Sequence, residues 1–344
     1  MKPSFNYSDL INYKELSSTD LLVVIYNGKY GYIDRSGNIV IEPNNVFTHA
    51  QNFSEGLALV TTGEQGNIHS LKRGYIDING DFAIESAFYL ADHFSEGLAP
   101  VAMHNFKSLK APIESGYINK QGNWIIKDNR FFQKPGRFKD NIAIVCYFDE
   151  NSGYQYSFIN RTGEFVFNFG FDYLTQFSEG LAVAQKSQNK YGFINKDGIF
   201  TIHQNFYEAE PFSDGLACVR PDLQHGYGFI DKAGDYIIDP IFDSARSFSD
   251  GMAVVEINNK FGFINKSGKL SIKNFYDSVL EFNEGLAPVK INDKWGYIDI
   301  SGNLVIDYNF DDAFNFTKGL SVVRINNKWG YLKPDGSYLW VPSA

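Results

Sequence analysis

Cysteine and methionine are scarce in this chain of 344 residues, which has 2 cysteines and 3 methionines. Disulfide-stapled domains need more cysteine, so we predict that Cys146 and Cys218 are small buried residues. Long apolar runs are also missing, since the longest, residues 21–26, is far shorter than the ~20 residues that cross a bilayer. The N-terminus has no apolar run before a cleavage site of small residues, so we expect no membrane span, no secretory signal and a cytoplasmic location.

Basic residues are in deficit, with 31 Lys and Arg against 40 Asp and Glu and a net charge of −9. This balance argues against a nucleic-acid partner, which requires a basic face, and mildly favours a basic protein partner. The six histidines do not lie at metal-ligand spacings, so no metal or cofactor is predicted: His49, His69, His93, His104, His203 and His225. Nucleophile-elbow and phosphate-loop motifs are absent, and we predict no catalytic residues.

One phrase of six residues recurs along the chain and decides the architecture. It reads Phe-Ser-Glu-Gly-Leu-Ala at residues 53–58, 94–99 and 177–182, with looser copies at 212–217, 248–253, 282–287 and 316–321. A second phrase, aromatic-Gly-aromatic-Ile, accompanies it in nine copies whose central residues are 31, 74, 116, 157, 192, 228, 262, 296 and 330. The spacing between these copies falls from 43 residues at the start to 34 at the end, so the N-terminal half carries insertions.

A turn follows each copy of the second phrase, as in Asp34-Arg35-Ser36-Gly37. Asp or Asn opens it because the side chain can bond the backbone two residues on, and glycine closes it because that position requires positive φ. We therefore predict a type I turn with a bulge between antiparallel strands, and three short strands per repeat. A connection of about ten residues, with an aromatic-acid pair such as Phe242-Asp243, leads to the next repeat.

The predicted fold is all-β, a tandem array of eight to nine three-stranded antiparallel units that share an aromatic interior. Residues 1–20 form a lead-in and residues 21–342 the array, irregular and loop-inserted over 21–170 and regular over 171–342. Propeller blades usually have four strands and roughly 40–45 residues, so the 34-residue repeat favours an open, twisted or superhelical array. A closed propeller-like toroid is the alternative.

The phrases at residues 292–299 and 326–331, both containing Lys-Trp-Gly-Tyr, resemble the bacterial WG repeat, also called the KWG repeat. The resemblance covers about residues 21–342 and implies an all-β repeat array without established catalysis. Only Trp295 and Trp329 keep the tryptophan, and we assign both a structural role. We predict that a side chain would collide with a ring or a facing backbone at the central glycines Gly31, Gly192, Gly228, Gly262, Gly296 and Gly330.

An acidic residue occupies the third or equivalent position of most copies of the first phrase: Glu55, Glu96, Asp140, Glu179, Asp214, Asp250 and Glu284. Lys318 interrupts the series. If the units stack in register, these carboxylates form a column that could grip a basic partner. The alternative is structural: each carboxylate caps a local turn or pairs with a repeat lysine such as Lys190, Lys260, Lys294 or Lys328.

Three early repeats carry insertions between their first and second strands, at residues 61–72, 103–115 and 147–155. Insertions in repeat proteins map to loops on one face, often the binding face, and three in succession predict a continuous rim. His69, His104 and Tyr154 lie in these insertions and join the acidic column as candidate partner-binding residues.

We therefore expect a non-catalytic scaffold that binds another protein through an extended β surface. One specific version is an immunity- or antitoxin-like protein whose acidic surface covers a basic toxin. A glycan- or cell-envelope-binding module is the first alternative, because aromatic rows can stack on sugar rings. An enzyme built on the inserted loops is the second. Partner identity and oligomeric state are left open.

Overall fold

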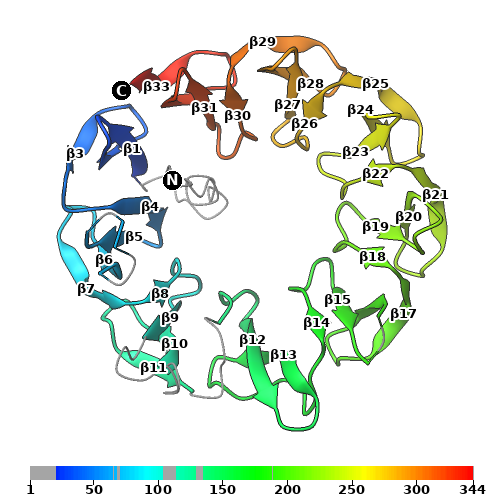
Figure 1. Cartoon of the computed structure of the whole chain (residues 1–344), viewed down its shortest axis with the longest axis horizontal. Coiled ribbons are helices and arrows are strands. Elements are labelled where there is room, and N and C mark those ends of the chain that lie inside the picture. The colour runs from blue at the N-terminus through cyan, green and yellow to red at the C-terminus, as the bar shows by residue number, and fades with distance from the viewer. Residues whose placement is uncertain are drawn as a thin grey trace. The chain divides into compact units, whose positions relative to one another are not determined.

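The computed structural model describes residues 21–64, 66–67, 70–103, 114–128, 135–187 and 189–343. The predicted lead-in, residues 1–20, lies outside them. Every regular element in the described part of the chain is a strand, and these strands form nine small antiparallel sheets in tandem (Figure 1). None of these nine sheets closes on itself. The all-β repeat array predicted from the sequence is therefore confirmed.

Contacts group the chain into two compact units, one ending at Phe169 and one running from Gly170 to Pro342. In the first unit the sheets are β1 Leu22–Tyr26, β2 Lys29–Ile33 and β3 Ile39–Asn44; β4 His49–Ser54, β5 Leu57–Thr62, β6 Lys72–Ile76 and β7 Phe82–Phe88; β8 Leu90–Ala91, β9 Ala99–Met103, β10 Glu114–Ile118 and β11 Trp124–Lys127; and β12 Ile142–Asp149 with β13 Gly153–Asn160.

The second unit contains five four-stranded sheets. They are β14 Tyr173–Leu174, β15 Ala182–Gln185, β16 Tyr191–Ile194 and β17 Phe200–Phe206; β18 Glu208–Ala209, β19 Ala217–Arg220, β20 Tyr227–Ile230 and β21 Tyr236–Phe242; β22 Ser244–Ala245, β23 Met252–Ile257, β24 Lys260–Asn265 and β25 Leu270–Tyr276; β26 Ser278–Val279, β27 Leu286–Ile291, β28 Lys294–Asp299 and β29 Leu304–Phe310; and β30 Asp312–Ala313, β31 Ser321–Ile325, β32 Lys328–Leu332 and β33 Tyr338–Ser343.

Most sheets contain one strand more than the sequence predicts. The three expected strands are present, and the connection that precedes the first of them adds a short fourth strand, as β18 does beside β19. Two residues are too few to show an alternating pattern of apolar and polar side chains, so this strand has no signature in the sequence. Its backbone pairs Glu208 with Arg220 and Ala209 with Val219.

The turn after the second strand has the predicted geometry. In the first copy, the amide of Gly37 donates to the carbonyl of Asp34 at 3.1 Å, and Gly37 has φ of 89°. The Asp34 carboxylate accepts hydrogen bonds from the amides of Ser36 and Asn38 at 2.8 and 2.9 Å. These bonds hold the pKa of Asp34 below its usual value, the Asn38 contacts being the largest cause.

The central glycine of the second phrase faces a bulge in the third strand. At Gly296 the pairing skips from Trp295 opposite Phe310 to Tyr297 opposite Ile306, which presses the backbone of β29 against the glycine. A Cβ atom there would lie 2.7 Å from the Ile306 carbonyl oxygen. The same close approach, 2.6–2.7 Å, recurs at Gly31, Gly192 and Gly228, which confirms the predicted collision with a facing backbone.

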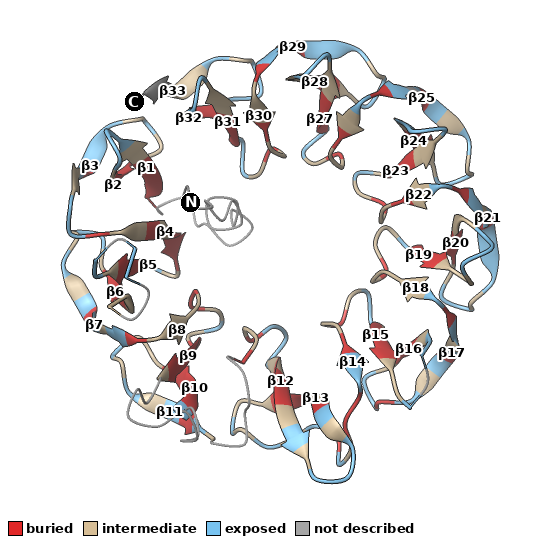
Figure 2. Ribbon diagram, viewed as in Figure 1, coloured by how far each residue is buried: buried red, intermediate tan, exposed pale blue. Residues whose placement is uncertain are grey.

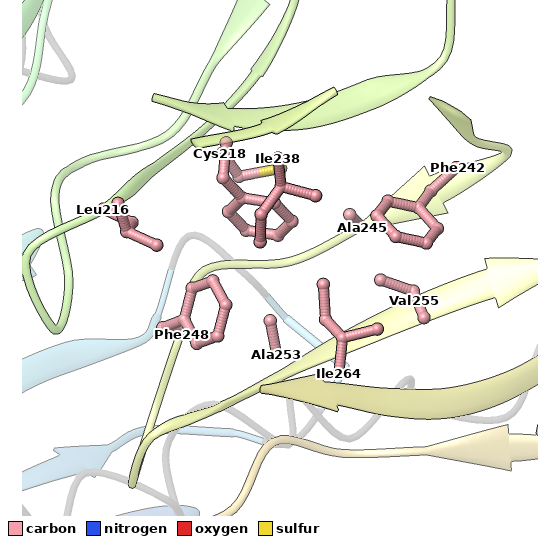
Figure 3. Packing of buried hydrophobic residues seen from close by; sticks show 10 residues of the cluster. Leu216, Cys218, Ile238, Phe242, Ala245, Phe248, Ala253, Val255 and Ile264 are labelled. Atoms are coloured by element: carbon pink, nitrogen blue, oxygen red, sulfur yellow. The ribbon is translucent and has the colours of Figure 1, made fainter. Parts of the chain in front are cut away.

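Neighbouring sheets share their cores. Figure 3 shows Cys218 and Ile238 of one sheet packed with Phe248, Val255 and Ile264 of the next, all at most 5 % exposed. The ring after a central glycine meets the phenylalanine of the following copy of the first phrase in most repeats, as in Phe263 and Phe282, whose centroids are 4.8 Å apart. Each such buried ring contributes roughly 1.5–3 kcal/mol, so contacts between repeats carry much of the stability.

Candidate interaction surfaces

The Phe-Ser-Glu-Gly phrase forms a tight turn in which both the acidic residue and the glycine have positive φ. Glu55 has φ of 52° and Gly56 of 87°, and Asp250 and Gly251 have 51° and 78°. Two positive φ values are the signature of a type I′ turn joining two strands. A non-glycine residue in this conformation costs roughly 1–2 kcal/mol, so its side chain is expected to make a compensating contact.

That contact runs forward to the next repeat. The carboxylates of six of the seven acidic residues, all but Asp140, accept a hydrogen bond from a backbone amide in the following copy of the turn, and we call these six the carboxylate ladder. Its bonds are Gly97 to Glu55 (3.0 Å), Asn141 to Glu96 (3.0 Å), Gly215 to Glu179 (3.1 Å), Gly251 to Asp214 (2.7 Å), Gly285 to Asp250 (2.8 Å) and Gly319 to Glu284 (2.8 Å). The carboxylates therefore do line up, but they connect one turn to the next.

The serine of the phrase reinforces this link. Its hydroxyl donates to the carbonyl of the phenylalanine that opens the next copy, at 2.6 Å from Ser178 to Phe212 and from Ser213 to Phe248. Asp140 occupies the same turn position with φ of 54°, and Lys318 does so with φ of 52°. The amide of Lys318 also donates to the Glu284 carboxylate, so the last turn takes part in the ladder as a donor although it has no carboxylate of its own.

Three ladder carboxylates have a basic partner, although none of these partners is among the repeat lysines suggested by the sequence. Lys120 lies 3.3 Å from Glu55, Arg161 3.5 Å from Glu96 and Lys232 3.1 Å from Glu179. Each of these basic residues belongs to the turn between the second and third strands. The ladder geometry therefore fits the structural interpretation, because the carboxylates are already engaged by the protein itself.

Two of the repeat lysines bind a different acid, the aspartate of the aromatic-acid pair in the connection. Lys260 lies 2.5 Å from Asp277, and Lys294 lies 2.6 Å from Asp311. Asp277 also accepts the backbone amide of Asn292 in the next repeat at 3.0 Å. The hydrogen bond from Lys260 is the main reason that the pKa of Asp277 lies below its usual value. Lys190 donates to the carbonyl of Asn205 at 3.3 Å.

The third insertion, residues 147–155, is a longer hairpin and not an added loop. It extends β12 and β13 to eight residues each. Tyr154, one of the candidate binding residues, is 50 % exposed near the tip and meets the 56 % exposed ring of Phe148 edge to face at 5.4 Å. His69 and His104, the candidates in the other two insertions, lie outside the described residues.

The tryptophans pack as half-buried rings at the edge of the shared cores. Trp295 lies against the cluster that contains Tyr297, Phe310 and Phe316. The ring of Trp329 is 6.1 Å from that of Phe314, and the Arg324 guanidinium lies 5.4 Å from its centre. Gly262 and Gly330 keep the register of the other central glycines, opposite Val255 and Val323.

A cleft that the sequence analysis missed lies in the unit Gly170–Pro342. It has a volume of about 360 Å³, and three consecutive sheets line it with Tyr173, Tyr191, Glu208, Ala209, Glu210, Cys218, Tyr227, Ser244, Ala245 and Arg246. Tyr227 donates to Glu208 at 2.6 Å, and burial together with this bond raises its pKa to about 12. Cys218 is 1 % exposed, and burial, with the charges of Glu210 and Glu208, raises the pKa of its thiol.

The described residues hold no group of three or more His, Cys, Asp or Glu side chains placed to bind a metal ion. They also include no helix of the length and apolar character that a bilayer crossing requires.

A family model described as "WG containing repeat" matches most of the chain, at residues 30–64, 74–105, 116–127, 156–190, 191–220, 227–261, 261–295 and 295–329. No curated protein matches the sequence. Each matched segment begins within or beside a copy of the second phrase; the segment at residues 261–295, for example, runs from β24 and β25 of one sheet into β26 and β27 of the next.

Solved structures similar to the chain include three proteins of different names. They are selenomethionine-substituted virginiamycin B lyase from Staphylococcus aureus, with 18% identity over 59% of this chain and 82% of that one and a TM-score of 0.37; a eukaryotic initiation factor, with 11% identity over 94% and 95% and a TM-score of 0.47; and puromycin hydrolase, with 10% identity over 93% and 57% and a TM-score of 0.42. Scores and identities this low carry no argument about function.

Proposed function

Because the chain belongs to the WG containing repeat family and is built almost entirely of stacked repeats, we propose that it is a non-catalytic scaffold that binds another protein through its extended β surface. Exposed apolar side chains on successive third strands support this proposal. In the unit Gly170–Pro342 these strands follow one another and are largely exposed (Figure 2). Such side chains in succession, set among polar ones, are characteristic of protein interfaces.

The outward positions of three third strands define this surface, which we call the third-strand face: residues 237, 239 and 241 of β21, 271, 273 and 275 of β25, and 305, 307 and 309 of β29. Ile237 is 49 %, Ile241 73 %, Phe275 50 % and Val305 47 % exposed. Charged residues occupy the centre of each strand, Asp239, Lys273 and Asp307, and discourage unwanted strand pairing. The face thus offers apolar contact area without being uniformly apolar.

A basic partner suits the net charge of −9, and the proposal includes an immunity- or antitoxin-like role in the cytoplasm against a basic toxin. The carboxylate ladder is a poor primary contact for it, because a partner would compete with the bonds between turns. We therefore assign first contact to the third-strand face and the long-range attraction to the overall negative charge.

The test is co-purification of the tagged full-length chain with the product of the neighbouring reading frame, identified by mass spectrometry. Ile241→Lys with Phe275→Lys should abolish the complex while the melting temperature stays unchanged. The matched control is Phe148→Lys with Tyr154→Lys, which removes two exposed rings from a different surface. Absence of a complex, together with no protection of cells that express the neighbouring product, would refute the proposal.

A glycan-binding function is the second candidate, and the exposed rings of Phe148 and Tyr154 favour it because sugars stack on such rings. Retention on a polysaccharide column that is lost in the Phe148→Ser, Tyr154→Ser variant would support it. Passage of the native chain through the column without retention would rule out the glycan-binding function.

A further inference from the structure

The cleft in the unit Gly170–Pro342 combines aromatic walls with carboxylates. Three tyrosine rings line it, those of Tyr173, Tyr191 and Tyr227. The first two meet edge to face at 5.2 Å, and Tyr173, 41 % exposed, is accessible to solvent. Tyrosine rings attract cations through their negative faces. A volume of about 360 Å³ is at the small end of ligand sites, which suits one side chain better than a large cofactor.

The two acidic residues of the cleft lie on the same short connection. Glu208 is the first residue of β18, and Glu210 is the residue directly after this strand, so the two acidic residues are two positions apart in the chain. Glu210 accepts the amide and the hydroxyl of Ser247 at 2.7 and 2.6 Å, which fixes its orientation. Glu208 accepts from Tyr227 and lies 3.5 Å from Arg220. Both carboxylates therefore stand in place before any ligand arrives.

The one basic residue that lines the cleft is already paired. Arg246 lies 3.1 Å from Glu281, which is not part of the lining. Glu208 is likewise paired with Arg220, so the lining and its ion-pair partners together carry three carboxylates and two guanidinium groups, a net negative charge. This imbalance favours a cationic occupant over an anionic or neutral one.

The composition is specific to this place in the array. The backbone bond from Glu210 to Cys218 identifies the corresponding residues of the next three repeats, Arg246, Leu280 and Phe314, which bond Val254, Pro288 and Val322 in the same way. Leu280 and Phe314 put apolar groups where Glu210 puts a carboxylate. Ser244 and Ser278 take the place of Glu208 in the next two repeats, and Asp312 keeps an acid there in the third, beside the apolar Phe314. The acidic, tyrosine-lined cleft is therefore not a property of the repeat as such.

We propose that this cleft binds the cationic side chain of an arginine or lysine contributed by the protein partner. The inference rests on the proposed function and specifies the chemistry of one anchor residue. The ammonium or guanidinium group lies between the Tyr173 and Tyr191 rings and the Glu208 and Glu210 carboxylates. Its methylene groups contact the faces of the tyrosines and bury apolar surface there.

The test uses arginine capped as Nα-acetyl methylamide, titrated into the full-length chain labelled with ¹³C-tyrosine. We expect saturable shifts in the resonances of Tyr173, Tyr191 and Tyr227, assigned by single Phe variants. Capped citrulline, which has the same shape without the charge, should cause none. Glu208→Gln with Glu210→Gln should weaken binding at least tenfold, and glutamine keeps the acceptors for Tyr227 and Ser247, so the fold is preserved.

Glu85→Gln with Glu150→Gln removes the same charge from exposed residues that neither line the cleft nor belong to the third-strand face, and serves as the control. Unshifted tyrosine resonances, equal shifts with citrulline, or binding that survives the double Gln change would overturn the inference. A partner complex that persists unchanged in the Gln variant would overturn it too, while leaving the proposed function intact. Specific binding of capped arginine without any detectable protein partner would support the cleft as a cation site and would count against the proposed function.

Discussion

Asp214 accepts a hydrogen bond from the backbone amide of Gly251, 37 residues further along the chain, at 2.7 Å. Asp214 is the first and Gly251 the second positive-φ residue of the same tight turn in consecutive repeats, so the bond fixes the register of one repeat on the next. Because the acid itself has φ of 55°, the contact offsets local backbone strain as well. The ladder therefore links local turn geometry to the stacking of repeats.

Replacing Asp214 with alanine should destabilise the protein by about 1–2 kcal/mol, because the Gly251 amide loses its acceptor. Asp214→Asn should cost much less, since asparagine retains an acceptor and tolerates positive φ. Asp239→Ala, which removes an exposed carboxylate from β21, is the control for lost charge. Urea unfolding measures all three, and equal stability of the Ala and Asn variants would show that the bond contributes nothing.

Gly296→Val should lower the free energy of unfolding by about 3 kcal/mol, because the new side chain meets the backbone of β29. The comparison is Gly285→Ala in the type I′ turn, where no atom lies within 4 Å of the added Cβ but φ is +79°. That change should cost only about 1 kcal/mol of backbone strain. Thermal and urea unfolding measure both, and an unchanged melting temperature for Gly296→Val would contradict the crowding seen at this position.

Much of this fold can be predicted from the sequence because its determinants are local. Asp34 and Gly37 specify their turn by side-chain bonding and positive φ, and Gly296 signals close backbone approach by lacking a Cβ atom. The short strand Glu208–Ala209 cannot be predicted, because two residues show no periodicity. Nor does the sequence show which group the Glu55 carboxylate contacts. A glutamate at this position could equally cap its own turn or accept a hydrogen bond from the turn of the next repeat.

The cleft escapes sequence reasoning for a related reason. Tyr173, Glu210 and Arg246 come from three repeats and occupy positions that vary from copy to copy. Only the stacking of sheets brings them together. A signal was nevertheless present, because Glu210 departs from the apolar Leu280 and Phe314 at the corresponding positions of later repeats. Departures from a repeat pattern are thus more informative about a site than the pattern itself.

Ser157 tests why the other repeats need glycine. It occupies the glycine position of the second phrase, yet no named third strand pairs with β13 in the described sheet. Beyond β12, the pairing of β13 consists of an isolated bridge between Ile159 and Phe165, with no bulge opposite Ser157. Its buried hydroxyl has no hydrogen-bond partner among the described residues. We therefore expect Ser157→Ala to be neutral or slightly stabilising.

The reciprocal change, Gly192→Ser, should destabilise by about 2 kcal/mol, because its Cβ would lie 2.6 Å from the Ile202 carbonyl oxygen. Chemical denaturation of the two variants beside the native chain gives the comparison. A similar loss in the free energy of unfolding for Ser157→Ala and Gly192→Ser would contradict the idea that the bulged third strand is the reason for glycine at this position.

Asp277 should make stability depend on pH. It lies 2.5 Å from Lys260, and this contact holds its pKa in the folded state below the usual value of an aspartate. A carboxylate with a lowered folded pKa adds stability above its unfolded pKa of about 4, and the contribution disappears as the pH falls through the folded pKa.

The stability gap between the native chain and Asp277→Asn should therefore be present at about pH 6.5 and shrink as the pH falls below the unfolded pKa of about 4 and through the lower folded pKa. Lys260→Met should narrow the gap at neutral pH, whereas Asp307→Asn, which removes an exposed carboxylate without an ion pair among the described residues, should show no comparable change with pH. Urea unfolding across this range measures the gap, and one of constant size would show that Lys260 does not favour the charged form of Asp277.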